Sequence, residues 1–88
     1  NTLLIMQIVN ILEIIKGIPS KIESFPIYED QLDQEVVEKA EELFKKMILE
    51  NHSFDDETEE DELEECLDNS YFDDNHGYKI YIIWSEIN

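Results

Sequence analysis

The sequence predicts a single α+β domain in which two or three helices pack with a small C-terminal antiparallel β-hairpin. Of the 88 residues, 28 are Leu, Ile, Val or Phe, a share well above the level of roughly a fifth found in disordered chains. Residues 32–48 carry apolar side chains at helical spacing, and β-branched and aromatic residues flank a glycine-containing turn near the C-terminus. Apolar segments at both ends of the chain indicate one shared core, so residues 1–88 are interpreted as one domain.

The first apolar segment, Thr2–Lys16, is predicted to be a helix that ends at Gly17. Its polar residues recur every three positions: Gln7, Asn10, Glu13 and Lys16. At helical spacing they form one narrow polar stripe, so most of the helix must be covered. It is interpreted either as the central core helix or as part of a homodimer interface. In the first case Ile8, Ile11 and Ile15 are expected to be buried.

Residues 18–28 are predicted to be a connector with at most a short edge strand, because Pro26 lacks the N–H that a central strand needs. A second helix is predicted to run to Asn51, with Asp30 and Asp33 at the spacing of a capping box. Its apolar positions form one stripe: Val36, Ala40, Leu43, Phe44, Met47 and Ile48. Three i,i+4 pairs are expected to stabilise its exposed side: Glu35–Lys39, Glu41–Lys45 and Glu42–Lys46.

The stretch 55–74 holds 12 carboxylates and no basic residue. Leu63, Cys66 and Leu67 would give it the narrow apolar face of a short third helix. Thr58, with Asp61 three residues on, is predicted to cap its N-terminus. Repulsion among the carboxylates is expected to leave this stretch only marginally ordered in the free protein.

The chain is predicted to end in a hairpin. Asp73–Gly77 has the composition of a turn, between the strand residues Ser70–Phe72 and Tyr78–Trp84. The second of these strands is apolar on both faces, so helices are expected to cover one of them.

The charge restricts the partners. At a net charge of −17 and without arginine, the chain is repelled by nucleic acids and anionic membranes, and it attracts basic proteins. The apolar residues 3–15 are too few and too often interrupted to span a bilayer, so no membrane association is expected. Cys66 is the only cysteine, which excludes an intramolecular disulfide, favours a reducing compartment and predicts a cytoplasmic location.

No pattern in the chain indicates catalysis. General acid–base chemistry needs a carboxylate whose pKa is shifted by burial or a matched partner, whereas these carboxylates lie in the most hydrophilic stretch. His52 and His76 are expected at a helix end and in a turn. A calcium loop with Gly77 at position 6 would need an oxygen ligand where Phe72 stands. We therefore expect no enzymatic activity, no cofactor and no dedicated metal site.

The acidic stretch is instead predicted to be a partner-binding surface. Charges steer association, and aromatic side chains anchor interfaces. The alternative is a solvated surface with no specific role. The predicted contacts are Asp55, Asp56, Glu59, Glu60, Asp61, Glu62, Glu64, Glu65, Asp68, Tyr71, Phe72, Asp73 and Asp74.

A short acidic chain of this kind resembles two groups of bacterial and phage proteins. One comprises the immunity proteins that neutralise nuclease toxins, such as the barstar family and those of contact-dependent inhibition. The other comprises DNA mimics, including anti-CRISPR and anti-restriction proteins. Phe25–Tyr28, followed by Leu32 and Asp33 at a helix start, is similar to the inhibitory loop and helix of the barstar family, and Tyr81–Ser85 is similar to its last strand.

The likeness to the barstar family covers about a fifth of the chain. Two features depart from that family: no strand is predicted before the first helix, and the family has no comparable acidic run. Carried over residue by residue, the resemblance implies only Tyr28 and Asp33 as inhibitory contacts.

The expected function is therefore that of a stoichiometric inhibitor of immunity type, whose acidic face blocks the basic active site of a nuclease toxin. One alternative is a phage-type DNA mimic that blocks a DNA-binding defence protein. Another is a dimerisation or regulatory subunit that pairs through the first helix. The first two readings imply a basic protein partner, and the sequence leaves open whether it acts on RNA or on DNA.

Overall fold

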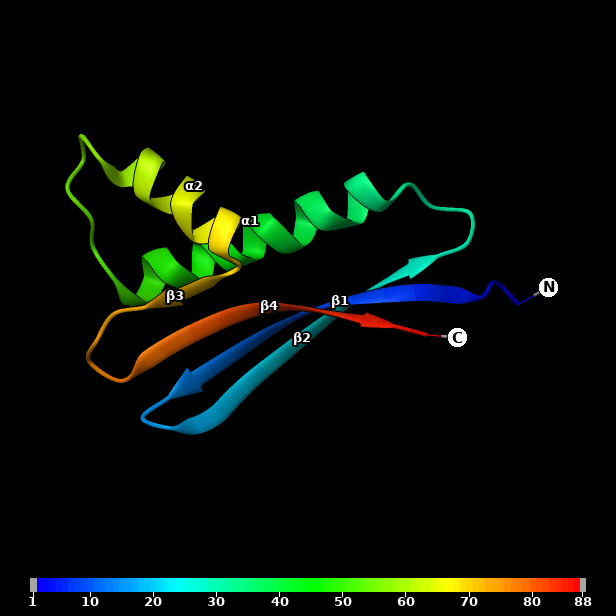
Figure 1. The fold of residues 1–88 in the computed structure, drawn as a ribbon, viewed down its shortest axis with the longest axis horizontal. Helices are drawn as coiled ribbons and strands as arrows, with labels where there is room; N and C mark the ends of the chain where they lie inside the picture. The colour runs from blue at the N-terminus through cyan, green and yellow to red at the C-terminus, as the bar shows by residue number, and fades with distance from the viewer. Residues whose placement is uncertain (1, 88) are drawn as a thin grey trace.

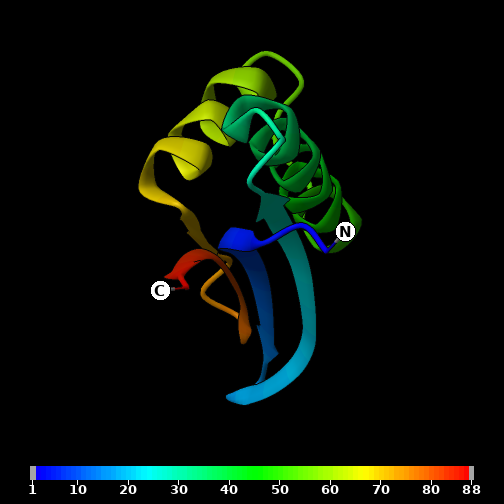
Figure 2. The same ribbon diagram turned by 90° about the vertical axis from the view of Figure 1, so that its right-hand side faces the viewer.

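The computed structural model describes residues 2–87, which form one antiparallel sheet and two helices (Figure 1). The elements in chain order are β1 (Ile5–Ile15), β2 (Ile18–Tyr28), α1 (Asp33–Asn51), α2 (Glu59–Asn69), β3 (Tyr71–Asp73) and β4 (Tyr78–Glu86). The strand order is β2-β1-β4-β3, and every neighbouring pair is antiparallel. Both helices lie on the same face of the sheet, and the other face has no layer over it (Figure 2).

The segment predicted to be the first helix is the central strand β1, so that prediction was wrong. Six of its 11 residues are Ile or Val, whose branched side chains favour strands. Polar residues three apart alternate between the two faces of a strand, as Asn10 and Glu13 do here. Ile11 is fully buried under the helices, as predicted. Ile8 is only half-buried, and Ile15 is 41% exposed, which contradicts the prediction for both.

A tight turn joins β1 to β2. Its two residues, Lys16 and Gly17, have φ values of 51° and 81°, the left-handed pair that a type I′ hairpin turn requires. Gly17 therefore closes a hairpin instead of ending a helix. Residues 18–28 were predicted to be a connector with at most a short edge strand, and this prediction was wrong, because the whole segment is the 11-residue strand β2. β2 lies at the edge of the sheet and tolerates Pro26 because one side of it has no neighbouring strand.

The structure confirms the helix predicted to end at Asn51, which is α1. Five residues of its apolar stripe are buried against the sheet: Val36, Ala40, Phe44, Met47 and Ile48. The capping box is not formed, because the helix begins after Leu32, whose side chain makes no capping hydrogen bond. The three predicted i,i+4 ion pairs are also not formed within residues 2–87. The ion pair on this helix joins Lys45 Nζ to Glu42, 3.1 Å apart at i,i+3.

The predicted C-terminal hairpin is confirmed as β3 and β4, but it is only part of the sheet. β4 pairs with β1 along its whole length, from Tyr78 opposite Ile15 to Glu86 opposite Gln7, so the two ends of the chain share one core. One face of β4 is covered by helices, as expected, and there Tyr78 and Ile80 are buried. The fold is α+β, with strands contributed from both ends of the chain (Figure 1).

Candidate protein-binding surface

α2 is the third helix predicted from the acidic stretch. It packs on the core through Leu63, which is 8% exposed, and through the half-buried Cys66 and Leu67. Thr58 precedes it, as predicted, but the Thr58 hydroxyl donates to Glu62 Oε2 at 3.2 Å and caps no backbone N–H. Its first turn is acidic, which suits the positive end of the helix dipole. Ser70 ends the helix in the left-handed conformation, with φ of 55°.

The outward side of α2 carries a row of carboxylates. We define the acidic ridge as the five exposed residues Glu60, Asp61, Glu64, Glu65 and Asp68. Among residues 2–87, the ion pairs are Lys21–Glu23 and Lys45–Glu42, so no lysine neutralises the ridge. Neighbouring carboxylates on a helix surface lie about 5–6 Å apart at the Cβ atoms, so their fields add.

A shallow hollow of about 390 Å³ lies beside the start of α2. Its apolar wall is an aromatic cluster in which the ring centroid of His52 lies 4.5 Å from that of Phe54 and 5.2 Å from that of Phe72. Phe54 and Phe72 also contact each other, at 5.8 Å, and both pack on the core. Four acidic residues line it: Asp55, Glu62, Asp73 and Asp74. Of these, Asp73 directs its side chain to the other face of the sheet, where it contacts Tyr71. We call this feature the aromatic hollow.

Asp73 and Asp74, two of the residues that line the aromatic hollow, stabilise the hairpin turn. Asp73 accepts hydrogen bonds from the backbone N–H of Asn75 (2.8 Å) and the hydroxyl of Tyr71 (3.0 Å). Asp74 accepts from the N–H groups of Tyr78 (3.0 Å) and His76 (2.7 Å), and these bonds lower the pKa of its carboxyl group. Both residues were predicted as partner contacts, and part of their hydrogen-bonding capacity is used inside the fold.

The two predicted aromatic anchors point to opposite faces of the sheet. Phe72 belongs to the aromatic hollow on the helix side. Tyr71 lies on the uncovered face, where its ring centroid is 4.8 Å from that of Tyr81. Its hydroxyl donates a hydrogen bond to Asp73. This bond is the largest cause, and burial the second, of the rise in the pKa of Tyr71 to about 12. The structure therefore places Phe72, and not Tyr71, in the aromatic hollow with Asp55 and Glu62.

Tyr28 and Asp33, the contacts implied by the resemblance to the barstar family, lie at the other end of α1 from the aromatic hollow. The 19 residues of α1 separate the two ends by roughly 28 Å. Asp33 lines a separate depression of about 400 Å³ with residues from β1 and β4, among them Gln7 and Glu86. The structure does not bring this pair together with the acidic ridge.

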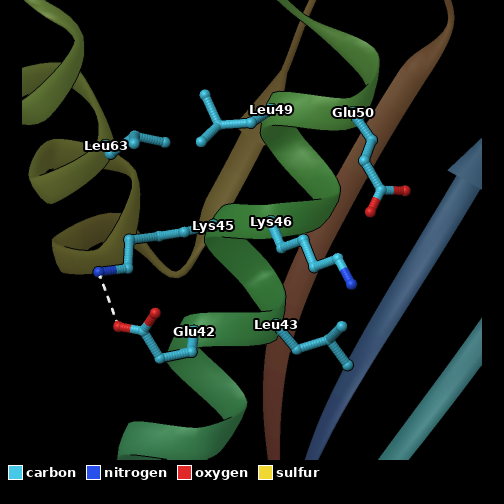
Figure 3. A pocket seen from close by; sticks show the side chains of 7 residues that line it. All are labelled: Glu42, Leu43, Lys45, Lys46, Leu49, Glu50 and Leu63. Atoms are coloured by element: carbon cyan, nitrogen blue, oxygen red, sulfur yellow. Dashed lines mark ion pairs between the residues drawn. The ribbon is translucent and has the colours of Figure 1, made fainter.

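A groove that the sequence did not reveal runs along α1. It has a volume of about 670 Å³, and Leu49 of α1 and Leu63 of α2 point toward each other across it (Figure 3). Lys45 reaches Glu42 there, while Lys46 points away from α2. This groove could not be found from the sequence because it depends on the placement of α2 beside α1.

The side chains of this surface with metal-binding or nucleophilic chemistry are its carboxylates, two histidines and Cys66. Within residues 2–87, no three His, Cys, Asp or Glu side chains converge as the ligands of a metal ion would. Burial, aided by Glu65 and Glu62, raises the pKa of the Cys66 thiol and so disfavours its nucleophilic thiolate. His52 is the C-terminal cap of α1, and His76 is exposed in the hairpin turn, as both were predicted.

Neither helix in residues 2–87 is both long and apolar enough to cross a membrane. The chain matches no protein-family profile, and its comparison with curated proteins and with solved structures gave no match.

Proposed function

We propose that this protein is a stoichiometric inhibitor that binds a basic protein, with the immunity of a cell to a nuclease toxin as the first candidate. The acidic ridge would occupy the positions of substrate phosphates on the basic active site.

The density of charge on α2 is the observation that carries the proposal. Its 11 residues include seven carboxylates, which at about 1.5 Å of rise per residue is about one charge per 2.4 Å of helix axis. A single DNA strand carries one charge per about 3.4 Å, and the duplex carries one per about 1.7 Å. A basic groove built for phosphates would therefore meet a similar line of charge on α2.

The aromatic hollow would fix the orientation of the partner. A lysine or arginine side chain entering it would meet the rings of Phe54 and Phe72 and the carboxylates of Asp55 and Glu62. A cation over an aromatic ring gains about 0.5–2 kcal/mol, and the carboxylates add charge-assisted hydrogen bonds. The ridge would then govern the association rate, and the hollow would govern the dissociation rate.

The second candidate is a DNA mimic that blocks a DNA-binding defence protein, and the same charge density favours it. The two candidates differ in breadth. An immunity protein binds one nuclease tightly, whereas a mimic of phosphate spacing binds several DNA-binding proteins weakly.

The test uses the nucleases encoded beside this gene, together with one basic ribonuclease and one basic deoxyribonuclease unrelated to them. Each is assayed with increasing amounts of this protein. Complete loss of one neighbouring activity at a 1:1 ratio supports immunity, and partial inhibition of several DNA-binding proteins supports mimicry. If no nuclease and no DNA-binding protein loses activity, the inhibitor proposal is wrong.

The role of the acidic ridge is tested with the triple variant E64Q/E65Q/D68N. It should lower the association rate with the inhibited protein by tenfold or more at low salt, and the loss should shrink as salt screens the charges. The control D30N/E35Q/E38Q removes the same number of charges at the far end of α1 and should leave the rate within about twofold. Equal effects of both triples would mean that only the total charge matters.

A further inference from the structure

The sheet face without helices is a second candidate surface, and it is apolar. We define the open face by the side chains Ile8, Leu12, Ile14, Ile22, Tyr81 and Ile83, which alternate onto this side of β1, β2 and β4. Ile22 is 64% exposed and Ile83 is 43% exposed. A contiguous apolar patch of this kind is characteristic of an interaction surface.

The open face is also nearly neutral in a chain of net charge −17. Among the strand positions that alternate onto it, the acid is Asp73 and the base is Lys79. These two lie directly opposite each other on β3 and β4, so their charges offset one another. α2, which carries the acidic ridge, lies on the other side of the sheet (Figure 2).

Three polar side chains of the open face, Asn10, Ser24 and Ser85, hydrogen-bond to one another. Ser24 Oγ donates to Asn10 Oδ1 at 2.7 Å, and Asn10 Nδ2 donates to Ser85 Oγ at 3.1 Å. The same amide nitrogen lies 3.3 Å from the carbonyl oxygen of Ile83. Covering this row would leave few unpaired polar groups, so the desolvation cost of covering the row is low.

We propose that the open face is covered by a second copy of this chain, in a two-fold symmetric sandwich of two sheets. This contact is independent of the inhibitor function proposed above. Nucleic acids and anionic lipids are repelled by the net charge, and a basic partner is drawn to the acidic ridge instead. A second copy offers an equally neutral apolar face, and a symmetric contact needs only that self-complementarity.

The sandwich also places the charges well apart. Stacked sheets lie about 10 Å apart, and a helix layer of similar thickness covers each outer face, so the two acidic ridges would be roughly 30 Å apart. That separation exceeds three times the Debye length of about 8 Å at physiological salt, so their repulsion is largely screened. Pairing through the helices would instead bring the ridges together.

The area of the open face sets the expected affinity of the dimer. Strands of nine and 11 residues are about 30–36 Å long, and three of them side by side are roughly 15 Å wide. Two such faces bury on the order of 1,000 Å², the lower limit for a specific interface. The dimer should therefore dissociate in the micromolar range.

The test is the mass of the purified full chain, measured by sedimentation equilibrium from about 5 μM to 1 mM at low and high salt. A dimer of the 10.5 kDa chain is expected, and it should strengthen with salt because salt screens the repulsion between two acidic copies. Binding to a basic partner must weaken with salt, so the two associations differ in the sign of their salt dependence. A chain that stays monomeric at 1 mM in 0.5 M salt overturns the proposal.

Variants locate the contact. Ile22→Lys and Ile83→Lys each place a charge on the open face, and each should raise the dissociation constant at least tenfold although it lowers the net negative charge. The control Leu32→Lys alters a residue that is 68% exposed beside α1 and should dimerise as the parent does. Circular dichroism establishes that each variant is folded. If folded Ile22→Lys and Ile83→Lys both dimerise like the parent, or Leu32→Lys abolishes the dimer, the contact is not the open face.

Discussion

α1 and the acidic region, residues 52–77, are stabilised in different ways. Five of the 19 residues of α1 are buried, and they cover the central strands. In residues 52–77 the only buried side chain is that of Leu63, beside the 12 carboxylates of positions 55–74. Burial of apolar area stabilises the first region. The acidic region is stabilised by the hydrogen bonds of its turn and by the contacts among His52, Phe54 and Phe72.

This difference predicts two levels of local stability within one small domain. The carboxylates of α2 repel one another and have no lysine partner among residues 2–87. The opening of α2 should therefore need less free energy than global unfolding, and partner binding should order it. The predictions below test this contrast, from the largest expected effect to the smallest.

Phe44→Ala should have the largest effect, because Phe44 is fully buried between α1 and the sheet. The expected loss is about 3–5 kcal/mol of unfolding free energy, a large part of the stability of a small domain. Urea unfolding followed by circular dichroism measures it. The control Leu49→Ala removes a side chain that is 42% exposed on the same helix and should cost less than about 1 kcal/mol. A loss below 1 kcal/mol for Phe44→Ala would contradict the assignment of the core.

Leu63→Ala should lower the unfolding free energy by about 2 kcal/mol, because Leu63 is the main contact of α2 with the core. The loss is at the low end of the range because Leu63 lies at the margin of the core. Hydrogen exchange should show lost protection in residues 59–69, while the amides around Phe44 stay protected. Equal loss of protection in both helices would mean that they unfold as one unit and would remove the contrast.

The triple E64Q/E65Q/D68N should stabilise the free protein. It removes like charges at i,i+4 spacing, and it removes negative charge from the C-terminal end of α2, where the helix dipole disfavours it. The unfolding free energy should rise by about 1 kcal/mol. The melting temperature should rise by about 4–8 °C. The control D30N/E35Q/E38Q should not stabilise, because Glu35 lies in the first turn of α1, where a carboxylate is favourable. A lower melting temperature for the α2 triple would show that the ridge is structurally required.

Asp74→Asn should have the smallest effect, and it should depend on pH. The pKa of Asp74 is lowered in the folded state by the N–H groups of Tyr78 and then His76, relative to about 3.9 in an unfolded chain. Its ionised carboxylate therefore contributes stability above pH 4 that is lost as the pH falls through the folded pKa. The variant should be less stable than the parent at pH 7, and the two should converge near pH 2. A difference that persists at pH 2 would point to lost packing instead.

The local signals in the sequence were sufficient for α1 and for the C-terminal hairpin. The apolar stripe through Phe44 fits only a helix, and the residues before Gly77 fit only a turn. The acidic helix was also predicted, because Leu63 and Leu67 fall on one face. Its neighbours were not predicted: the aromatic hollow joins His52 and Phe72, which are distant in sequence and meet only through the pairing of β3 with β4.

What the sequence by itself determined is the net charge, the stripe of α1, the acidic ridge and the turn that ends at Gly77. Each of these depends on residues a few positions apart. Only the tertiary structure decided that residues 5–15 form a strand. A polar residue at every third position suits a helix with one polar stripe, and it also suits a strand with polar residues on both faces. Pairing with β2 and β4 resolves that ambiguity, because those strands satisfy the backbone of β1 on both sides while α1 covers Ile11 and leaves Ile8 on the open face.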